Sequence, residues 1–314
     1  MAREAGEAMR HTDHGRQRDE RRGNDAVDHA AHGPQPSSNQ QPSGGPQPSG
    51  NQRPNSEREA DVVHQVDQAI LRRRIGLCSV TFRQLTADEV IAAAVGAGLE
   101  CIEWGGDIHV PTGDTARAED AARRTADAGL TVASYGSYWR ADEDITPVLD
   151  SAAALGADRV RIWAGRIGSA EATEVERHAI TDAIAEASAS ARDLGITLAL
   201  EYHSGTIADT PDAVRRLLDD VPGLRTYWQP TVGAPDEVAL HEYDLLRDAV
   251  AAVHVFSWWP TTQRLRLAQR ESLWSPLFRT AAEPRDALLE FVPHDDPDLL
   301  ALEAATLRKW ISQW

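Results

Sequence analysis

The sequence predicts an α/β protein of the (β/α)8 or TIM barrel class, preceded by a disordered N-terminal tail. From residue 74 onward, eight short apolar runs of strand character each precede a helical pattern, with short connections between them. Repeated βα units form a parallel sheet, and eight units in about 240 residues match a closed barrel better than an open doubly wound sheet. A nucleotide-binding open sheet would also carry a glycine-rich turn after its first strand, and this chain has none there.

Residues 1–73 differ sharply in composition from the rest of the chain. The stretch 33–56 consists mostly of Gly, Pro, Ser, Gln and Asn, which cannot bury enough apolar surface to offset the entropy of ordering. The histidines of this part, His11, His14, His29 and His32, are scattered rather than set at ligand spacing. We therefore expect a disordered low-complexity tail over residues 1–73 and a barrel over residues 74–314. An overcalled start codon is an alternative explanation of the tail.

Strand and helix positions follow from the hydrophobic pattern. The expected strands are 75–80, 100–104, 130–135, 158–163, 196–202, 224–228, 251–256 and 287–292. The expected helices are 86–97, 115–128, 144–155, 172–194, 210–220, 241–249, 271–282 and 297–314, of which 271–282 follows a long irregular loop. Thr86 and Glu89 fit a capping box, and Gly98, Gly129 and Gly195 stand where left-handed helix ends are expected.

Composition excludes several classes of function. The formal net charge is -17, and so acidic a surface repels phosphate backbones and argues against a nucleic-acid partner. Lys309 is the single lysine and lies near the C-terminus, which argues against Schiff-base and pyridoxal-phosphate chemistry. No run reaches the ~20 apolar residues of a membrane span, and no secretory signal core is present, so we expect a cytoplasmic protein without a membrane partner.

Cysteine usage agrees with a reducing compartment. Cys78 and Cys101 would form at most one bridge and do not make a disulfide framework. Cys78 lies on the first strand without a histidine beside it in sequence. We assign it to packing rather than to nucleophilic catalysis.

Candidate functional residues stand at the ends of the later strands, where barrel enzymes build their sites. In the run 198–206, Glu201 and His203 share one face by the two-residue period of a strand, while Leu198 and Leu200 share the other. If the leucines pack against helices, Glu201 and His203 point into the barrel mouth.

Three further strands end in a polar side chain: Gln229 on the sixth, His254 on the seventh and Glu290 on the eighth. A lone strand-end glutamate is more often the partner of an arginine, but four such residues on successive strands favour a site. Two carboxylates, one imidazole and an amide oxygen suit a divalent cation such as Mn²⁺, Mg²⁺ or Co²⁺ better than zinc. We expect this metal to be held by Glu201, Gln229, His254 and Glu290.

These residues carry a resemblance. From residue 75 onward the chain is similar to the xylose-isomerase-like superfamily, labelled sugar phosphate isomerase/epimerase, whose members include ketose 3-epimerases, hydroxypyruvate isomerase, inosose dehydratase and endonuclease IV. The family pattern places Glu, Asp, His and Glu at the ends of strands five to eight, where this chain has Glu201, Gln229, His254 and Glu290. Three positions match. At the remaining position Gln229 stands where the family has Asp, so the site has one negative charge fewer, which should weaken metal binding. A role for Gln229 in binding substrate remains open.

The resemblance implies a metal-dependent sugar or polyol isomerase or epimerase, in which Glu201 and Glu290 act as acid and base through an enediolate. A keto-cyclitol dehydratase, a keto-glycoside lyase and a non-catalytic carbohydrate-binding barrel remain alternatives. An endonuclease IV-like activity would need more histidines than the barrel part contains. We expect a small, unphosphorylated sugar or polyol as the partner, and leave open a homo-oligomer.

Secondary candidates lie at or beyond the strand ends. The residues expected to contact substrate are Glu103, Trp104, His109, Tyr138, His203 and Arg264. The other aromatic residues available as walls are Tyr135, Trp139, Trp163, Trp228, Trp258 and Trp259. The alternatives are a salt bridge between Glu103 and Arg161, core packing for any single aromatic residue, a plain turn around His109 and a solvated Arg264.

Overall fold

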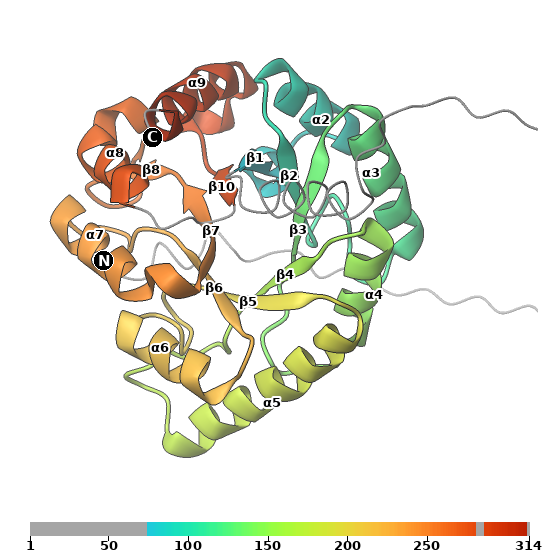
Figure 1. Cartoon of the computed structure of the whole chain (residues 1–314), viewed down its shortest axis with the longest axis vertical. Coiled ribbons are helices and arrows are strands. Elements are labelled where there is room, and N and C mark those ends of the chain that lie inside the picture. The colour runs from blue at the N-terminus through green and yellow to red at the C-terminus, as the bar shows by residue number, and fades with distance from the viewer. Residues whose placement is uncertain (1–73, 281–285, 313–314) are drawn as a thin grey trace, which may run out of the picture. The chain divides into compact units, whose positions relative to one another are not determined.

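A closed barrel of eight parallel strands forms the centre of the protein (Figure 1). The computed structural model describes residues 74–280 and 286–312; the tail expected over residues 1–73 lies outside the described residues, as do the ends of the expected helices 271–282 and 297–314. The barrel strands are β1 (Arg74–Cys78), β2 (Cys101–Gly105), β3 (Thr131–Gly136), β4 (Arg159–Ile162), β5 (Thr197–Glu201), β6 (Arg225–Trp228), β7 (Val250–Val255) and β10 (Asp286–Leu289). The barrel closes because β1 pairs with both β2 and β10, which confirms the predicted fold class.

Helices follow the strands in sequence and surround the barrel, so that α9 returns to the side of α2 (Figure 1). They are α2 (Ala87–Gly96), α3 (Thr115–Asp127), α4 (Thr146–Leu155), α5 (Glu174–Asp193), α6 (Pro211–Asp220), α7 (Asp236–Leu246), α8 (Glu271–Thr280) and α9 (Leu300–Ile311). A short antiparallel hairpin, β8 (Ser257–Trp258) and β9 (Arg264–Leu265), occupies the loop after β7. None of the helices in the described part of the chain is long and apolar enough to cross a membrane.

Helix ends agree with the sequence signals in most cases. Thr86 and Glu89 form the expected capping box at α2, and Gly98, Gly129 and Gly195 have positive φ at the ends of their helices. The predicted position of the sixth helix, 241–249, was wrong. Helix α7 begins at Asp236, directly after Pro235, because the buried Ala239, Tyr243 and Leu246 recur at helical spacing.

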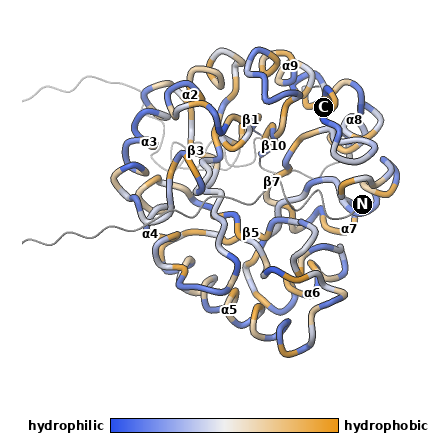
Figure 2. Tube along the Cα trace, turned by 180° about the vertical axis from the view of Figure 1, so that it is seen from behind, coloured by the Kyte–Doolittle hydropathy of each residue, from blue (hydrophilic) through white to orange (hydrophobic). Residues whose placement is uncertain are grey.

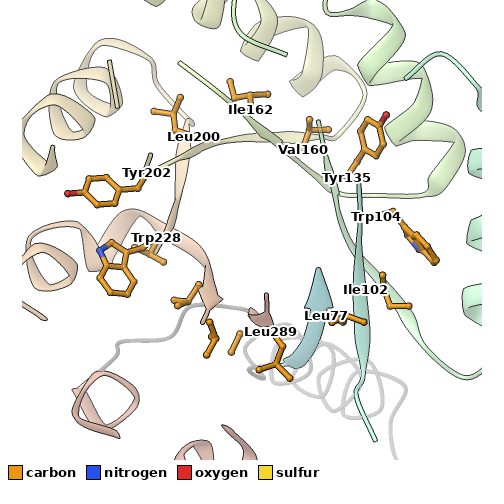
Figure 3. Packing of buried hydrophobic residues seen from close by; sticks show 14 of the residues in the cluster. Leu77, Ile102, Trp104, Tyr135, Val160, Ile162, Leu200, Tyr202, Trp228 and Leu289 are labelled. Carbon is orange, nitrogen blue, oxygen red and sulfur yellow. The ribbon is translucent and has the colours of Figure 1, made fainter. Parts of the chain in front are cut away.

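The core has two layers separated by the strands. Outward-facing strand residues pack against the helices, among them Leu77, Trp104 and Trp228, which stand on the outer side of the barrel in Figure 3. The helices correspondingly alternate between hydrophilic and hydrophobic residues along their turns (Figure 2). A second cluster fills the interior of the barrel, where mostly small side chains surround Tyr227: Cys78, Val80, Cys101, Ala133, Ala199, Tyr227, Ala252 and Leu288. Leu198 and Leu200 belong to the outer layer, as the sequence pattern predicted, which turns Glu201 inward.

An ion-pair network closes the N-terminal end of the barrel. The fully buried Asp286 pairs with Arg74, at 2.6 Å, and with Arg159. Arg159 is itself buried and donates from Nε to the Tyr227 hydroxyl at 2.8 Å. Because both carboxylate oxygens of Asp286 are engaged by guanidinium groups, the buried charges at this end are compensated.

Candidate active site

Four polar side chains from successive strands meet at the C-terminal end of the barrel. Glu201 ends β5, Gln229 follows β6, His254 lies in β7 and Glu290 follows β10. The Oε1 atom of Gln229 lies 3.3 Å from Nδ1 of His254, which in turn lies 3.4 Å from Oε2 of Glu290. Gln229 Nε2 is 3.5 Å from Glu201 Oε1. The structure thus brings together the four residues that the sequence singled out as metal ligands.

The second nitrogen of His254 faces a buried carboxylate. Nε2 of His254 lies 3.4 Å from Oε1 of Glu103 on β2, and Ser134 donates to the other oxygen of Glu103 at 2.7 Å. A proton on Nε2, turned toward Glu103, leaves the lone pair of Nδ1 facing Gln229 and Glu290. In metal sites, a carboxylate that accepts a hydrogen bond from the other ring nitrogen of a histidine ligand fixes the orientation of the imidazole.

Arg161, on β4, joins two of the carboxylates. Its guanidinium pairs with Glu201, and its Nε lies 3.1 Å from Glu103. All three side chains are almost fully buried. The salt bridge between Glu103 and Arg161, an alternative raised by the sequence, is therefore confirmed, whereas the bond from Arg161 to Glu201 was not foreseen.

The two strand-end glutamates have opposite pKa shifts. Burial alone would raise the pKa of Glu201, but the Arg161 guanidinium outweighs it and holds that pKa below its usual value. Burial raises the pKa of Glu290 to about 6, and the nearby charge of Glu201 adds to this effect. Oε2 of Glu290 is buried and accepts no hydrogen bond from the described residues. One carboxylate is thus held ionised while the other keeps a free oxygen.

The donor set fits a divalent cation. Nδ1 of His254 lies close to Oε1 of Gln229 and to Oε2 of Glu290, and when Nε2 carries the proton all three atoms are acceptors that suit a cation. Glu103, Glu201 and Glu290 together with Arg161 carry a net charge of about -2 when all are ionised, which one divalent cation neutralises. Burial would lower the pKa of His254, but the charges of Glu290 and Glu103 raise it, so the site attracts positive charge.

Cys78 lies beside this centre. Its sulfur and one ligand atom each of His254 and Glu290 lie within 4.8 Å of one another. Burial raises the pKa of Cys78 well above its usual value, and the charges of Glu103 and Glu290 raise it further, so the side chain remains a thiol. Sequence reasoning placed Cys78 in packing, and its neighbours come from strands far away in the chain.

Two of the expected substrate contacts lie near the mouth. Tyr138 stacks on Trp163 with ring centroids 6.3 Å apart and accepts a hydrogen bond from Arg83 at 2.7 Å. His203, two residues after Glu201, lies with its ring centroid 4.3 Å from that of Trp163, and its Nδ1 donates to the carbonyl of Ser204. Nε2 of His203 therefore carries a lone pair in the neutral ring, which suits a substrate hydroxyl.

Arg264 is placed on the hairpin close to the residue after Glu290. Its guanidinium carbon lies 5.0 Å from the ring centroid of Phe291 and 5.7 Å from that of Trp258. Asp295 pairs with the guanidinium. Phe291 and Asp295 both have positive φ, so this loop is held in a strained conformation around Arg264.

Two other candidates have structural places. Trp104 is fully buried between β2 and α3, where Nε1 donates to Thr125 at 3.1 Å. Because Glu103 points inward, the two-residue period turns Trp104 outward, and the expected substrate contact was wrong (Figure 3).

His109 is buried too: its ring nitrogens lie 3.0 Å from the Ser79 hydroxyl and 3.1 Å from the Leu85 carbonyl oxygen, so both nitrogens have partners within the fold. Trp228 and Tyr135 likewise belong to the outer core rather than to the mouth.

The fold and this strand-end cluster together define a barrel of the kind that carries its functional groups at the C-terminal ends of the strands. Residues 91–270 match the family model described as xylose isomerase-like TIM barrel. This match covers more than half of the chain, and the protein belongs to that family.

Solved structures with the same fold include enzymes of different reaction classes. The probable 3-DHS dehydratase AsbF of Bacillus anthracis is 19% identical, with a TM-score of 0.62, covering 75% of this chain and 98% of that one. The 3-keto-D-glucoside 4-epimerase YcjR of E. coli is 16% identical, with a TM-score of 0.60, covering 76% and 100%. A xylose isomerase-like protein of Mycobacterium smegmatis in complex with magnesium is 15% identical, with a TM-score of 0.58, covering 77% and 97%. Comparison of the sequence with curated proteins gives no match.

Proposed function

We propose that the protein is a metal-dependent isomerase or epimerase that acts on a sugar or polyol by moving a proton at a carbon next to a carbonyl group. The observation that carries this proposal is the convergence of Glu201, Gln229, His254 and Glu290 from four successive strands. The named neighbours, a dehydratase and an epimerase among them, support an enzyme, and the magnesium complex supports a divalent cation.

The four residues would have different roles in the reaction. Glu201, Gln229, His254 and Glu290 would hold the cation. When bound, a divalent cation stabilises negative charge that develops on substrate oxygens. Among the described residues Glu290 forms no ion pair with an arginine, unlike Glu201, so it is the better suited of the two to take a proton from carbon and return it. Glu201 is held by Arg161 and Gln229, which favours a role in binding and orientation.

This inequality bears on the reaction. Inverting one carbon by direct epimerisation needs an acid or base on each face of the substrate, so Glu201 would have to leave Arg161 to take part. Aldose–ketose isomerisation moves a proton between neighbouring carbons and needs one group on one face. Elimination of water from a keto-cyclitol, or of a glycoside from a keto-sugar, begins with the same proton abstraction. Aldose–ketose isomerisation is therefore our first candidate reaction, and elimination by a lyase is the second.

Proton exchange with solvent tests the proposal. The full chain, loaded with Mn²⁺ and then exchanged into Mg²⁺ for NMR, is incubated in D₂O with a panel of aldoses, ketoses and keto-cyclitols. We expect deuterium to enter one substrate next to its carbonyl carbon. Glu290→Gln should slow this exchange by at least about 100-fold, and Glu119→Gln, an exposed change on α3, should leave it unchanged. Binding of a panel member without any exchange would favour a non-catalytic carbohydrate-binding barrel and contradict the proposal.

A further inference from the structure

Arg140, in the loop between β3 and α4, is a half-buried guanidinium without an acidic partner. Within the described residues it forms no ion pair, in a chain whose formal net charge is -17. Asp142, an acidic residue of the same loop, is engaged by Arg166 at 2.7 Å. An arginine in so acidic a protein would ordinarily find a carboxylate, so Arg140 is kept free for another purpose or held away by its surroundings.

The surroundings hold Arg140 firmly. Its guanidinium carbon lies 3.9 Å from the ring centroid of Trp163, and Nη1 donates to the carbonyl of Gly165 at 3.1 Å. The next residue, Ala141, has φ of 61°, a conformation that costs a non-glycine residue about 1 kcal/mol or more and persists only where packing enforces it. The position of Arg140 is therefore built into the loop.

Arg140 packs on an aromatic pair beyond the ends of strands β4 and β5. Trp163 directly follows the last residue of β4, and His203 comes two residues after the end of β5. Their rings pack against each other with centroids 4.3 Å apart. Trp163, which carries Arg140, is 4% exposed, and its indole Nε1 is buried without a hydrogen-bond partner among the described residues. Arg140 thus offers a guanidinium edge beside the ends of strands β4 and β5.

We propose that Arg140 binds a carboxylate group of the substrate, so that the enzyme acts on a sugar acid or a related hydroxy acid. The Nε and Nη2 atoms of Arg140 have no partner in the described structure, and together they form the edge of the guanidinium that pairs with both oxygens of a carboxylate. The inference rests on the proposed function for the position of the reacting carbon, but the anion site itself does not depend on catalysis.

Two further observations agree with an anionic occupant. Burial lowers the pKa of Arg140 and the charge of Arg166 lowers it further, and the carboxylates of Glu201 and Asp142 offset only a part of this, so a negative ligand would stabilise the guanidinium. The loop after β10, FVPHDDPD, is acidic and offers no cluster of donors for a phosphate group. One guanidinium edge suits a carboxylate better than a phosphate dianion, which ordinarily takes more donors.

Isothermal titration calorimetry tests the inference with a matched set of one acid, one neutral sugar and one sugar phosphate, and with two further acids. D-glucuronate, D-glucose and D-glucose 6-phosphate differ only at carbon 6, and D-galacturonate and D-glycerate extend the set to other scaffolds. The full chain should bind at least one of the three acids about tenfold or more tighter than D-glucose and D-glucose 6-phosphate, which corresponds to about 1.4 kcal/mol. Arg140→Gln should remove this preference, Arg140→Lys should retain a part of it, and the control Arg123→Gln, an exposed change on α3, should keep it.

Several results would overturn the inference. These are equal affinity for D-glucose, tighter binding of D-glucose 6-phosphate, a preference for acids that survives in Arg140→Gln, and no binding of any of the acids up to about 10 mM. Repeating the titration without added metal separates the two proposals. A carboxylate preference without deuterium exchange in any acid would leave the anion site standing and count against the proton-transfer function, and exchange in a neutral sugar alone would do the reverse.

Discussion

The guanidinium of Arg161 pairs with the carboxylate of Glu201, and both side chains are buried at the C-terminal end of the barrel. Arg161 also lies 3.1 Å from Glu103, so one fixed positive charge joins two negative ones beside the candidate metal centre. This pairing distinguishes the two strand-end glutamates, because no arginine of the described residues pairs with Oε2 of Glu290.

Substitution of Arg161 should destabilise the fold, because it leaves the buried carboxylates of Glu103 and Glu201 without a counter-charge. In Arg161→Gln two buried carboxylates lose their guanidinium, and we expect the free energy of unfolding to fall by about 3–5 kcal/mol. A divalent cation should restore a larger part of the stability in this variant than in the wild type, because it replaces the lost positive charge. Thermal unfolding with and without Mn²⁺ measures both effects. A variant as stable as Arg166→Gln, which changes an exposed arginine, would contradict the expectation.

Glu103 should affect the metal affinity of the proposed centre through its contact with His254. Glu103→Gln keeps the size of the side chain but removes the carboxylate that faces Nε2 of His254, so the imidazole is no longer held in one tautomer. Partners of this kind change metal affinity by about 10–100-fold when they are altered. Titration with Mn²⁺ in competition with a chelator gives the affinity, and Glu119→Gln serves as the exposed control. Unchanged affinity in Glu103→Gln would remove Glu103 from the metal centre.

The opposite end of the barrel should affect stability without affecting the site. Asp286→Asn leaves Arg74 and Arg159 without their shared carboxylate inside the barrel, and we expect a loss of about 3 kcal/mol in the free energy of unfolding. Mn²⁺ affinity should stay within about twofold of the wild type at temperatures where the variant is folded. Asp244→Asn, which alters an exposed pair with Arg247, should change stability by less than about 1 kcal/mol.

His109 should make the fold sensitive to mild acid. Burial lowers its pKa in the folded state, with a smaller opposing effect from the Leu85 carbonyl, so the unfolded chain binds a proton first as the pH falls. The stability associated with neutral His109 is complete above the unfolded-state value of about 6.5 and declines below it. His109→Asn should unfold more easily at pH 7 and show a flatter decline between about pH 6.5 and pH 5 than the wild type. An unchanged slope in His109→Asn would show that other groups set the acid sensitivity.

The sequence predicted the barrel and the inward direction of its strand-end polar side chains because both follow from local periodicity. Leu198 and Leu200 had to face the helices, so Glu201 had to face inward, and the same argument applies to the other strands. Trp104 shows the limit of counting aromatic residues near strand ends, since the inward Glu103 already decided its direction. The period itself was sufficient to correct that prediction.

Contacts between distant segments were beyond the reach of the sequence. Arg161 and Glu201 are neighbours because β4 and β5 pair in one particular register, and Cys78 approaches His254 only when the barrel closes. Arg140 lies in a loop whose conformation depends on Trp163 and on the positive φ of Ala141. Hydrophobic periodicity carries no information about such contacts, because they depend on strand register and loop geometry.

Metal analysis of the full-length protein, beside a Glu290→Gln variant, is the most direct test of the proposed centre. After incubation with Mn²⁺ and removal of free metal, we expect about one divalent ion per wild-type chain and clearly less in the variant, because Glu290 supplies one of four ligands. Absence of bound metal in the wild type, or equal content in both proteins, would contradict the metal centre formed by Glu201, Gln229, His254 and Glu290.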